Sequence, residues 1–280
     1  MILPDTQNLP DTRAIAIPAV GVTPLAMPLR IDDGGDIHHV SATVALYTSL
    51  AGDRKGTHLS RLVESVMPLA DAVLTPRSLR AVLAEARGRL DADEAFLAVQ
   101  FRYDMRKPAP VSELTGYVPY DVGLIALDGP SGVEEGLTLN VPITTLCPCS
   151  KAISQYGAHN QRGRLFMTAA LEETGRTFSL GARVGALEAL GSSPVFSLLK
   201  RTDEKEVTER AYETPKFVED VVRDAVLWLE AERQFGWYRV RVSNDESIHA
   251  HNAVALYDSA RALKPRPRPG FYDYLDLISP

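Results

Sequence analysis

Four short segments of the sequence concentrate side chains that can bind a metal or move a proton. They are residues 144–151, 156–163, 198–205 and 246–252, and each combines Cys, His, Asp or Glu with other polar residues. Together they supply thiolate, imidazole and carboxylate groups, the ligands that suit Zn²⁺ or a similar first-row divalent metal. A mononuclear metal site is therefore one hypothesis for these segments.

The spacing of these residues does not decide between a metal site and ordinary structural roles. The sequence has no Cys-x-x-Cys pair and no His-Glu-x-x-His motif. Cys147 could equally be a small buried apolar residue. His159 and His251 could be loop or strand-end histidines with ordinary hydrogen bonds. Residue types alone leave both interpretations open.

Composition and charge limit the classes of protein and partner. Cys147 and Cys149 are separated by one proline, so a disulfide between them would close a strained ring, and reduced thiols used in chemistry are expected. The net charge of -6 gives no reason to expect a nucleic-acid partner. No apolar run approaches the ~20 residues of a membrane span, and residues 1–13 lack the pattern of a secretory signal. We therefore expect a cytoplasmic protein without nucleic-acid or membrane partners.

Apolar patterns in the first half predict the elements that position these segments. Thr75-Pro76 is typical of a helix start, with a capping hydroxyl before a proline at the first helical position. Alternating or helical apolar spacing predicts strands at 40–46, 96–103 and 123–127 and helices at 59–66 and 76–90.

The second half follows a similar order. Thr214-Pro215 predicts another helix start, with an apolar stripe that continues to Leu229, whereas residues 180–200 receive no assignment. Strands are predicted at 137–145, 164–171, 237–242 and 252–257. Each half thus reads approximately strand, strand, helix, helix, strand, strand, which indicates a duplicated α+β unit. We divide the chain into an N-terminal arm (1–30), a first module (31–130), a second module (131–262) and a solvated C-terminal tail (263–280).

Three long strings of unusual residues resemble one enzyme family. They are LCPCSKAISQYGAHNQRG at 146–163, LLKRTDEKEVTERAYETPKFVED at 198–220 and ESIHAHNA at 246–253. They resemble the type IB GTP cyclohydrolases, also called GTP cyclohydrolase I type 2, and the similarity extends over most of the chain. The resemblance implies a tunnelling fold: two tandem modules, each a four-stranded antiparallel sheet with two helices, whose barrel is closed by oligomerisation. Family members are expected to be homotetramers with active sites at subunit boundaries.

The resemblance also implies a reaction and a metal site. The family converts GTP and water into 7,8-dihydroneopterin triphosphate and formate, the first step of tetrahydrofolate synthesis, by attack of a metal-activated water on C8 of guanine. One divalent metal per active site is implied, as Zn²⁺, Mn²⁺ or Fe²⁺. The positions that match its ligands are Cys147, His159, Glu204 and His249, with Glu206 as the alternative carboxylate.

Further residues are implied in catalysis and substrate binding. Cys147 and His159 are joined by His251 as catalytic residues, His251 as a proton relay or a purine-orienting group. Cys149 is expected to be a supporting or structural residue. Glu219 would accept hydrogen bonds from the guanine ring, although a carboxylate near a helix start is also favourable by itself. The donors expected for the triphosphate are Lys151, Arg162, Lys200 and Arg201.

Three rival functions remain at this point. Another tunnelling-fold enzyme, such as a nitrile reductase of queuosine synthesis, would use a cysteine nucleophile with NADPH and no metal. A non-catalytic binding module would use the metal only to stabilise its fold. A relative that forms a cyclic phosphate product, as in archaea, is a narrower alternative.

Overall fold

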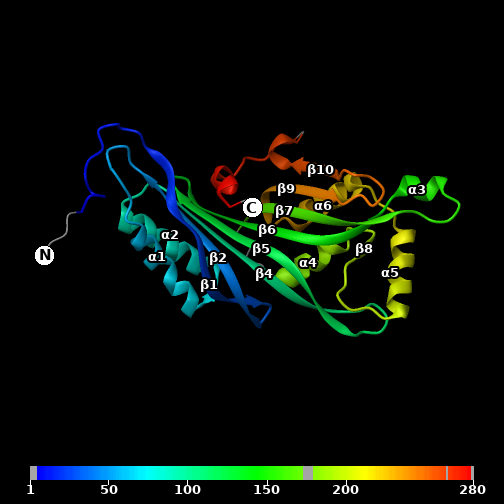
Figure 1. The fold of residues 1–280 in the computed structure, drawn as a ribbon. Helices are drawn as coiled ribbons and strands as arrows, with labels where there is room; N and C mark the ends of the chain where they lie inside the picture. Colours follow the sequence, from blue (N-terminus) through cyan, green and yellow to red (C-terminus); the bar gives the residue numbers. More distant parts are fainter. Residues whose placement is uncertain (1–4, 173–178, 263, 279–280) are drawn as a thin grey trace. The chain divides into compact units, whose positions relative to one another are not determined.

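The computed structural model describes residues 5–172, 179–262 and 264–278, and the chain divides into two compact units (Figure 1). Unit 1 comprises Met1–Phe101, Gly123–Gly136 and Pro269–Pro280, and unit 2 comprises Arg102–Val122 and Leu137–Arg268. Three long strands contribute a segment to each unit: β4 (Ala95–Pro108), β5 (Thr115–Gly129) and β6 (Gly132–Leu146).

Unit 1 is built around the antiparallel pair β1 and β2. β1 (Ile17–Asp33) pairs with β2 (Asp36–Leu50), β2 pairs with β4, and the short β3 (Val73–Leu74) lies parallel to β1. Between β2 and β4 the chain forms the helices α1 (Leu59–Val66), η1 (Met67–Asp71) and α2 (Pro76–Leu90). Their buried apolar side chains belong to the core of this unit, and they include Leu62, Val66, Leu69, Leu79 and Leu83.

The predicted start of α2 is confirmed by its capping geometry. The Ser78 N–H donates to Thr75 Oγ1 at 3.1 Å, and the Thr75 N–H donates to Ser78 Oγ at 2.9 Å. This reciprocal pair satisfies two backbone donors that the first helical turn leaves free.

Parts of the expected N-terminal arm and C-terminal tail belong to defined elements. Residues 17–30 of the expected arm belong to β1. Beyond the expected second module, η3 (Gly270–Leu277) packs within unit 1, where Phe271 is fully buried and Tyr274 stacks on Phe96 with ring centroids 4.8 Å apart. These aromatic side chains account for the packing, because their burial removes a large apolar area from water.

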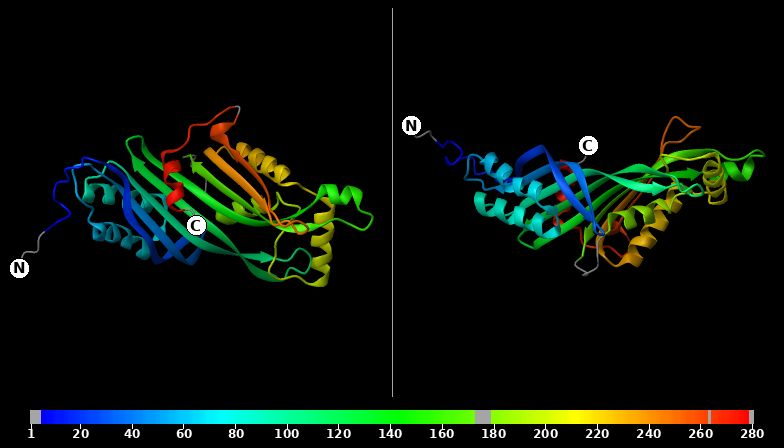
Figure 2. Two further views of the ribbon diagram at one scale, coloured as in Figure 1. Left: turned by 45° about the horizontal axis from the view of Figure 1, so that its top comes forward. Right: turned by 90° about the horizontal axis from the view of Figure 1, so that it is seen from below.

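Unit 2 contains a sheet and all four segments with candidate metal-binding residues, 144–151, 156–163, 198–205 and 246–252. Its strand order is β10–β9–β7–β6–β5–β4, with β8 also paired to β6. Along the chain its further elements are α3 (Pro148–Ile153), β7 (Asn160–Leu171), α4 (Leu180–Glu188), β8 (Ser193–Pro194), α5 (Arg201–Glu213), α6 (Val218–Glu232), β9 (Phe235–Asn244), β10 (Ala253–Asp258) and η2 (Ser259–Arg261). The helices α4 and α6 lie on one face of these strands (Figure 2).

The core of unit 2 is formed by the buried face of β9 and the apolar stripe of α6. On β9, Tyr238, Val240 and Val242 are buried at every second position, as a strand with one covered face requires. The stripe of α6 that packs on β9 contributes Val221, Ala225 and Leu229. The predicted alternation in 237–242 is therefore confirmed.

The predicted helix start at Thr214-Pro215 is wrong. Thr214 ends α5, and α6 begins at Val218. The Phe217 N–H donates to Asp220 Oδ2 at 3.0 Å, so a carboxylate caps α6 instead of the threonine hydroxyl. No helix among the described residues is long and apolar enough to cross a membrane.

Candidate active site

Several connections meet at one end of the unit 2 sheet. β6 ends at Leu146 and β7 begins at Asn160, while Asn244 at the end of β9 pairs with both Gly163 and Ala253. The loops that carry residues 147–159 and 245–252 therefore leave the sheet at the same end. The segment before α6 joins them, because the Lys216 N–H donates to Leu146 O at 3.0 Å.

Cys147 and His159 are held together by the backbone at this end. The Cys147 N–H donates to His159 O at 3.1 Å. Ser150 closes the arrangement: its hydroxyl donates to Cys147 O at 3.1 Å and accepts from the His159 N–H at 3.2 Å. The Ser150 N–H also donates to Cys147 Sγ at 3.4 Å. Cys147 is half-buried, whereas Cys149 is exposed.

The His159 ring has one nitrogen occupied by a neighbouring amide. Its Nδ1 lies 2.9 Å from Gln161 Oε1, and Gln161 Nε2 donates to Thr145 Oγ1 at 2.8 Å. Gln161 and Thr145 are both buried. An amide oxygen only accepts hydrogen bonds, so this contact is a hydrogen bond in the tautomer that carries the proton on Nδ1 and leaves the lone pair on Nε2. Gln161, Thr145 and Ser150 lie within the segments 144–151 and 156–163 that the sequence singled out, but the sequence assigned none of them a role.

Glu219 and Lys151 lie on helices whose N-terminal ends adjoin Leu146 and Cys147. Glu219 is exposed in the first turn of α6, three residues after the Lys216 contact with Leu146. Lys151 Nζ donates to Tyr212 O and lies 4.2 Å from the centre of the Tyr212 ring. Lys151 thus joins α3 to the end of α5.

The loop of His249 and His251 is joined to the start of β7. The Asp245 N–H donates to Arg162 O at 2.9 Å. The two imidazole rings are stacked, with centroids 5.0 Å apart and planes inclined by 17°. Both histidines and Arg162 are exposed, so they are accessible to a ligand at this end of the sheet.

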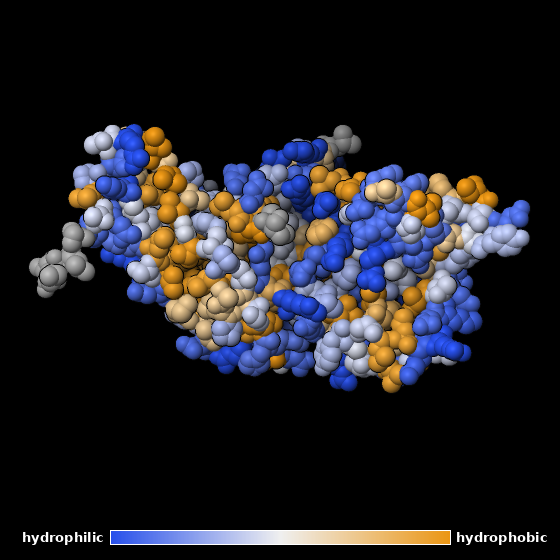
Figure 3. Space-filling model, viewed as in Figure 1, coloured by the Kyte–Doolittle hydropathy of each residue, from blue (hydrophilic) through white to orange (hydrophobic). Residues whose placement is uncertain are grey.

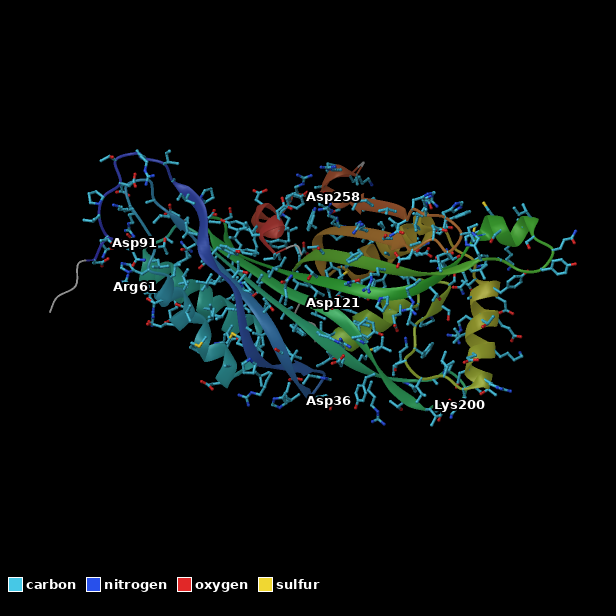
Figure 4. All side chains as sticks on the ribbon, viewed as in Figure 1. Asp36, Arg61, Asp91, Asp121, Lys200 and Asp258 are labelled. Atoms are coloured by element: carbon cyan, nitrogen blue, oxygen red, sulfur yellow. The ribbon has the colours of Figure 1, made fainter. Side chains whose placement is uncertain are left out.

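Lys200, Arg201 and Glu204 lie at the other end of α5. Glu204 precedes Tyr212 by eight residues, which corresponds to about 12 Å along the helix axis. Figure 4 labels Lys200 at the end of α5 that is remote from α3. Glu206 is paired with Arg210 at 2.9 Å, whereas Glu204 has no ion pair among the described residues, which favours Glu204 as the free carboxylate.

Asp203 fixes that end of α5 in place. This fully buried carboxylate accepts hydrogen bonds from the Val111 N–H and the Ser112 N–H at 2.8 Å, the Ser112 hydroxyl at 2.6 Å and the Lys200 N–H at 2.8 Å. Burial by itself raises the pKa of Asp203, but these donors, Ser112 first, outweigh it and hold the pKa well below its usual range. Sequence reasoning missed this residue beside Glu204.

The predicted metal ligands are thus only partly brought together. Among the residues that the structure describes, no group of three or more His, Cys, Asp and Glu side chains is arranged to hold a metal ion. Cys147 and His159 are adjacent, His249 lies in a neighbouring loop, and Glu204 lies at the far end of α5. Within one chain, the backbone brings together two of the four predicted ligand residues, Cys147 and His159.

Comparison with known proteins gives one family across nearly the whole chain. Residues 3–255 match the family model described as type I GTP cyclohydrolase folE2. A GTP cyclohydrolase FolE2 of Thermosipho melanesiensis is 39% identical over 256 residues, which cover 91% of this chain and 97% of the relative. The GTP cyclohydrolase FolE2 1 of Dechloromonas aromatica is 43% identical over 258 residues, covering 91% and 95%.

Solved structures with a similar fold are uricases. Uricase from Arthrobacter globiformis superposes with a TM-score of 0.54 at 8% sequence identity, covering 91% of this chain and 97% of that one. A thermostable mutant of the same enzyme gives a TM-score of 0.51 at 9% identity. At such low identity the likeness shows the fold alone, and it confirms the tunnelling fold expected from the sequence.

Proposed function

The chain belongs to the type I GTP cyclohydrolase FolE2 family, and on that premise we propose how its residues open the guanine ring of GTP. It is a GTP cyclohydrolase of folate biosynthesis, and a nitrile reductase activity is not favoured. The reaction converts GTP and water into 7,8-dihydroneopterin triphosphate and formate. The observation that carries the assignment to this site is the Cys147–His159 pair, which the backbone holds together inside the matched region.

Cys147, His159, Glu204 and His249 would hold one divalent metal, as Zn²⁺, Mn²⁺ or Fe²⁺. The two residues within one chain fit such an ion, because their backbones are hydrogen-bonded to each other, and the contact of His159 Nδ1 with Gln161 leaves Nε2 for a metal. When bound, the metal would lower the pKa of a water molecule and so supply the nucleophile for guanine C8.

We propose that the site is completed by a second copy of the chain, in a homotetramer. Glu204 is held away from Cys147 by the length of α5, so a neighbouring chain is the source of the missing carboxylate. Two surface features support association. Ile153 and Tyr156, close to Cys147, are 85% and 97% exposed, and apolar residues are visible among hydrophilic ones on the unit 2 surface (Figure 3). The outer edge of β10 is also unpaired among the described residues.

The remaining residues bind substrate and move protons. Glu219 accepts hydrogen bonds from the guanine N–H and amino groups, which its exposed place in the first turn of α6 permits. Arg162, Lys200 and Arg201 donate to the triphosphate, and Lys151 supports α3 through Tyr212 besides any phosphate contact. His251, stacked on His249, is placed to relay a proton.

GTP is the substrate, and we propose that the enzyme works in the cytoplasm, with no nucleic-acid or membrane partner.

One experiment tests the proposed function. Metal-free protein is incubated with GTP and one divalent metal at a time, and the mixture is oxidised and examined for a fluorescent pterin. We expect fluorescence with at least one of Zn²⁺, Mn²⁺ and Fe²⁺ and none after chelation. Turnover that persists in thoroughly chelated protein would refute the metal role, and its absence with every metal would refute the assignment.

A further inference from the structure

The buried side chains of Thr145 and Gln161 form a relay that ends on the His159 ring. Gln161 is 5% exposed and Thr145 is fully buried, and they lie on the neighbouring strands β6 and β7. The amide nitrogen of Gln161 is anchored on Thr145 Oγ1 at 2.8 Å, which turns its oxygen toward His159 Nδ1 at 2.9 Å. A buried amide bound at both ends does not rotate freely, because rotation would leave polar groups without partners.

We propose that Gln161 is a positioning residue that fixes His159 in the Nδ1–H tautomer and directs the Nε2 lone pair outward. The two ring nitrogens of histidine are distinct, and the partner of one decides what the other can do. With Nδ1 protonated, Nε2 is the only ring atom that can bind a metal. The inference rests on the proposed function, since it assigns a purpose to the Nε2 lone pair.

The relay also restrains the direction of the ring. His159 is the last residue before β7, and its backbone already contacts Cys147 and Ser150. The His159 side chain is further restrained by the contact of its Nδ1 with Gln161 Oε1. The backbone hydrogen bond to Cys147 fixes where the His159 backbone lies and the Gln161 contact restrains its ring, and such restraint lowers the entropy lost when the ring binds an ion.

A purely structural role for Gln161 predicts different behaviour. In that case the amide would only satisfy Thr145 and join β6 to β7, and its loss would lower stability without altering the His159 ring. The two roles are separated by variants that keep or remove the acceptor. Gln161→Met removes the acceptor with an unbranched chain of similar length, whereas Gln161→Glu keeps an acceptor next to Nδ1.

The matched control is Gln234→Met in the same unit. Gln234 is also part-buried and uses its amide, accepting from Arg183 and donating to Glu232, but it has no contact with His159. Thermal unfolding of all three variants checks that each remains folded.

The first readout is the tautomer of His159 in metal-free protein. Ring nitrogens are observed by ¹⁵N NMR above pH 8, where an ordinary imidazole with a pKa of about 6.5 is neutral, and His159 is assigned by comparison with His159→Ala. We expect a protonated Nδ1 in wild type, Gln161→Glu and Gln234→Met, and loss of this preference in Gln161→Met. A protonated Nε2 in wild type would overturn the proposal.

The second readout is metal affinity, measured by competition with a chelator. Loss of a group that orients a metal ligand typically weakens binding about 10- to 100-fold. We expect that loss in Gln161→Met, near wild-type affinity in Gln234→Met, and substantial rescue in Gln161→Glu. If Gln161→Met kept both the wild-type metal affinity and the wild-type tautomer of His159, the Gln161 amide would only join β6 to β7, and the proposal would be wrong. Because the NMR arm uses no metal and no GTP, it stands even if the proposed reaction fails in the turnover assay.

Discussion

Removal of the Glu219 carboxylate separates guanine recognition from metal binding. The side chain is exposed in the first turn of α6, and the start of that helix is held by other groups: the Asp220 cap and the Lys216 contact with Leu146. Glu219→Ala should therefore leave the helix and the Cys147 loop in place. A hydrogen bond to a charged group contributes roughly 1.5–3 kcal/mol, which is about 10- to 100-fold in affinity at ~1.4 kcal/mol per decade.

The assay is titration of a non-hydrolysable GTP analogue into metal-loaded protein, with metal content measured in the same samples. We expect Glu219→Ala to bind the analogue at least ~10-fold more weakly with metal content unchanged. Glu219→Gln should be only partly rescued, because its amide nitrogen turns a donor toward the ring donors. The control is Glu209→Ala, which removes an exposed carboxylate of α5 that is paired with Lys205.

Two outcomes would refute this reasoning. Unchanged affinity in Glu219→Ala would mean that guanine is anchored elsewhere and that Glu219 only favours the helix start. An equal loss in Glu209→Ala would mean that net charge, and not a specific acceptor, governs nucleotide binding.

Three further predictions concern the thiol, the imidazoles and the buried carboxylate. Cys147→Ala should remain folded and lose nearly all cyclohydrolase activity while Cys149→Ala keeps a measurable fraction; equal residual activity would contradict the roles assigned to the two thiols. His159→Ala and His249→Ala should each lose metal on dialysis, by at least ~10-fold in affinity, and metal retention by both would exclude this ligand set. Because hydrogen bonds depress the folded-state pKa of Asp203, its contribution to stability is present above about pH 4 and is lost as the pH falls further. Urea unfolding between pH 5 and 2.5 should therefore show a shallower acid loss in Asp203→Asn than in wild type, and parallel curves would contradict this.

Elements with an apolar stripe or an ordinary cap could be predicted from the sequence. α2 and β9 are examples, because Thr75 caps the helix and burial alternates along the strand from Tyr238 to Asn244. α5 was not predicted, since Arg201–Glu213 buries only Asp203 and Ala211 and so has no apolar stripe to recognise. The missing apolar stripe of α5 also explains why the start of α6 was misplaced. Because α5 was not recognised, Thr214 was interpreted as the first residue of the next helix, whereas it follows the last residue of α5.

The candidate site was predictable as a set of residues but not as an arrangement. Cys147 and His159 belong to one string of the sequence, and a turn of the chain brings their backbones together. The contribution of Gln161 depends on Thr145 across the strand pair, which no local pattern encodes. Glu204 belongs to a helix whose direction is set by tertiary contacts at both ends, so its distance from Cys147 could not be read from the motif.

Those contacts make α5 a spacer of defined length. At its start, Asp203 binds the turn at Val111 and Ser112, and at its end Tyr212 receives Lys151 from α3. The neighbouring carboxylates of Asp203 and Glu204 thus divide two tasks: one is buried to hold the helix, and the other is left exposed about 12 Å along the axis from Tyr212. A helix fixed at both ends cannot carry Glu204 to the Cys147 of its own chain without breaking one of these contacts. The exposed carboxylate is therefore held away from the Cys147 of its own chain, which supports the proposal that a second chain completes the site.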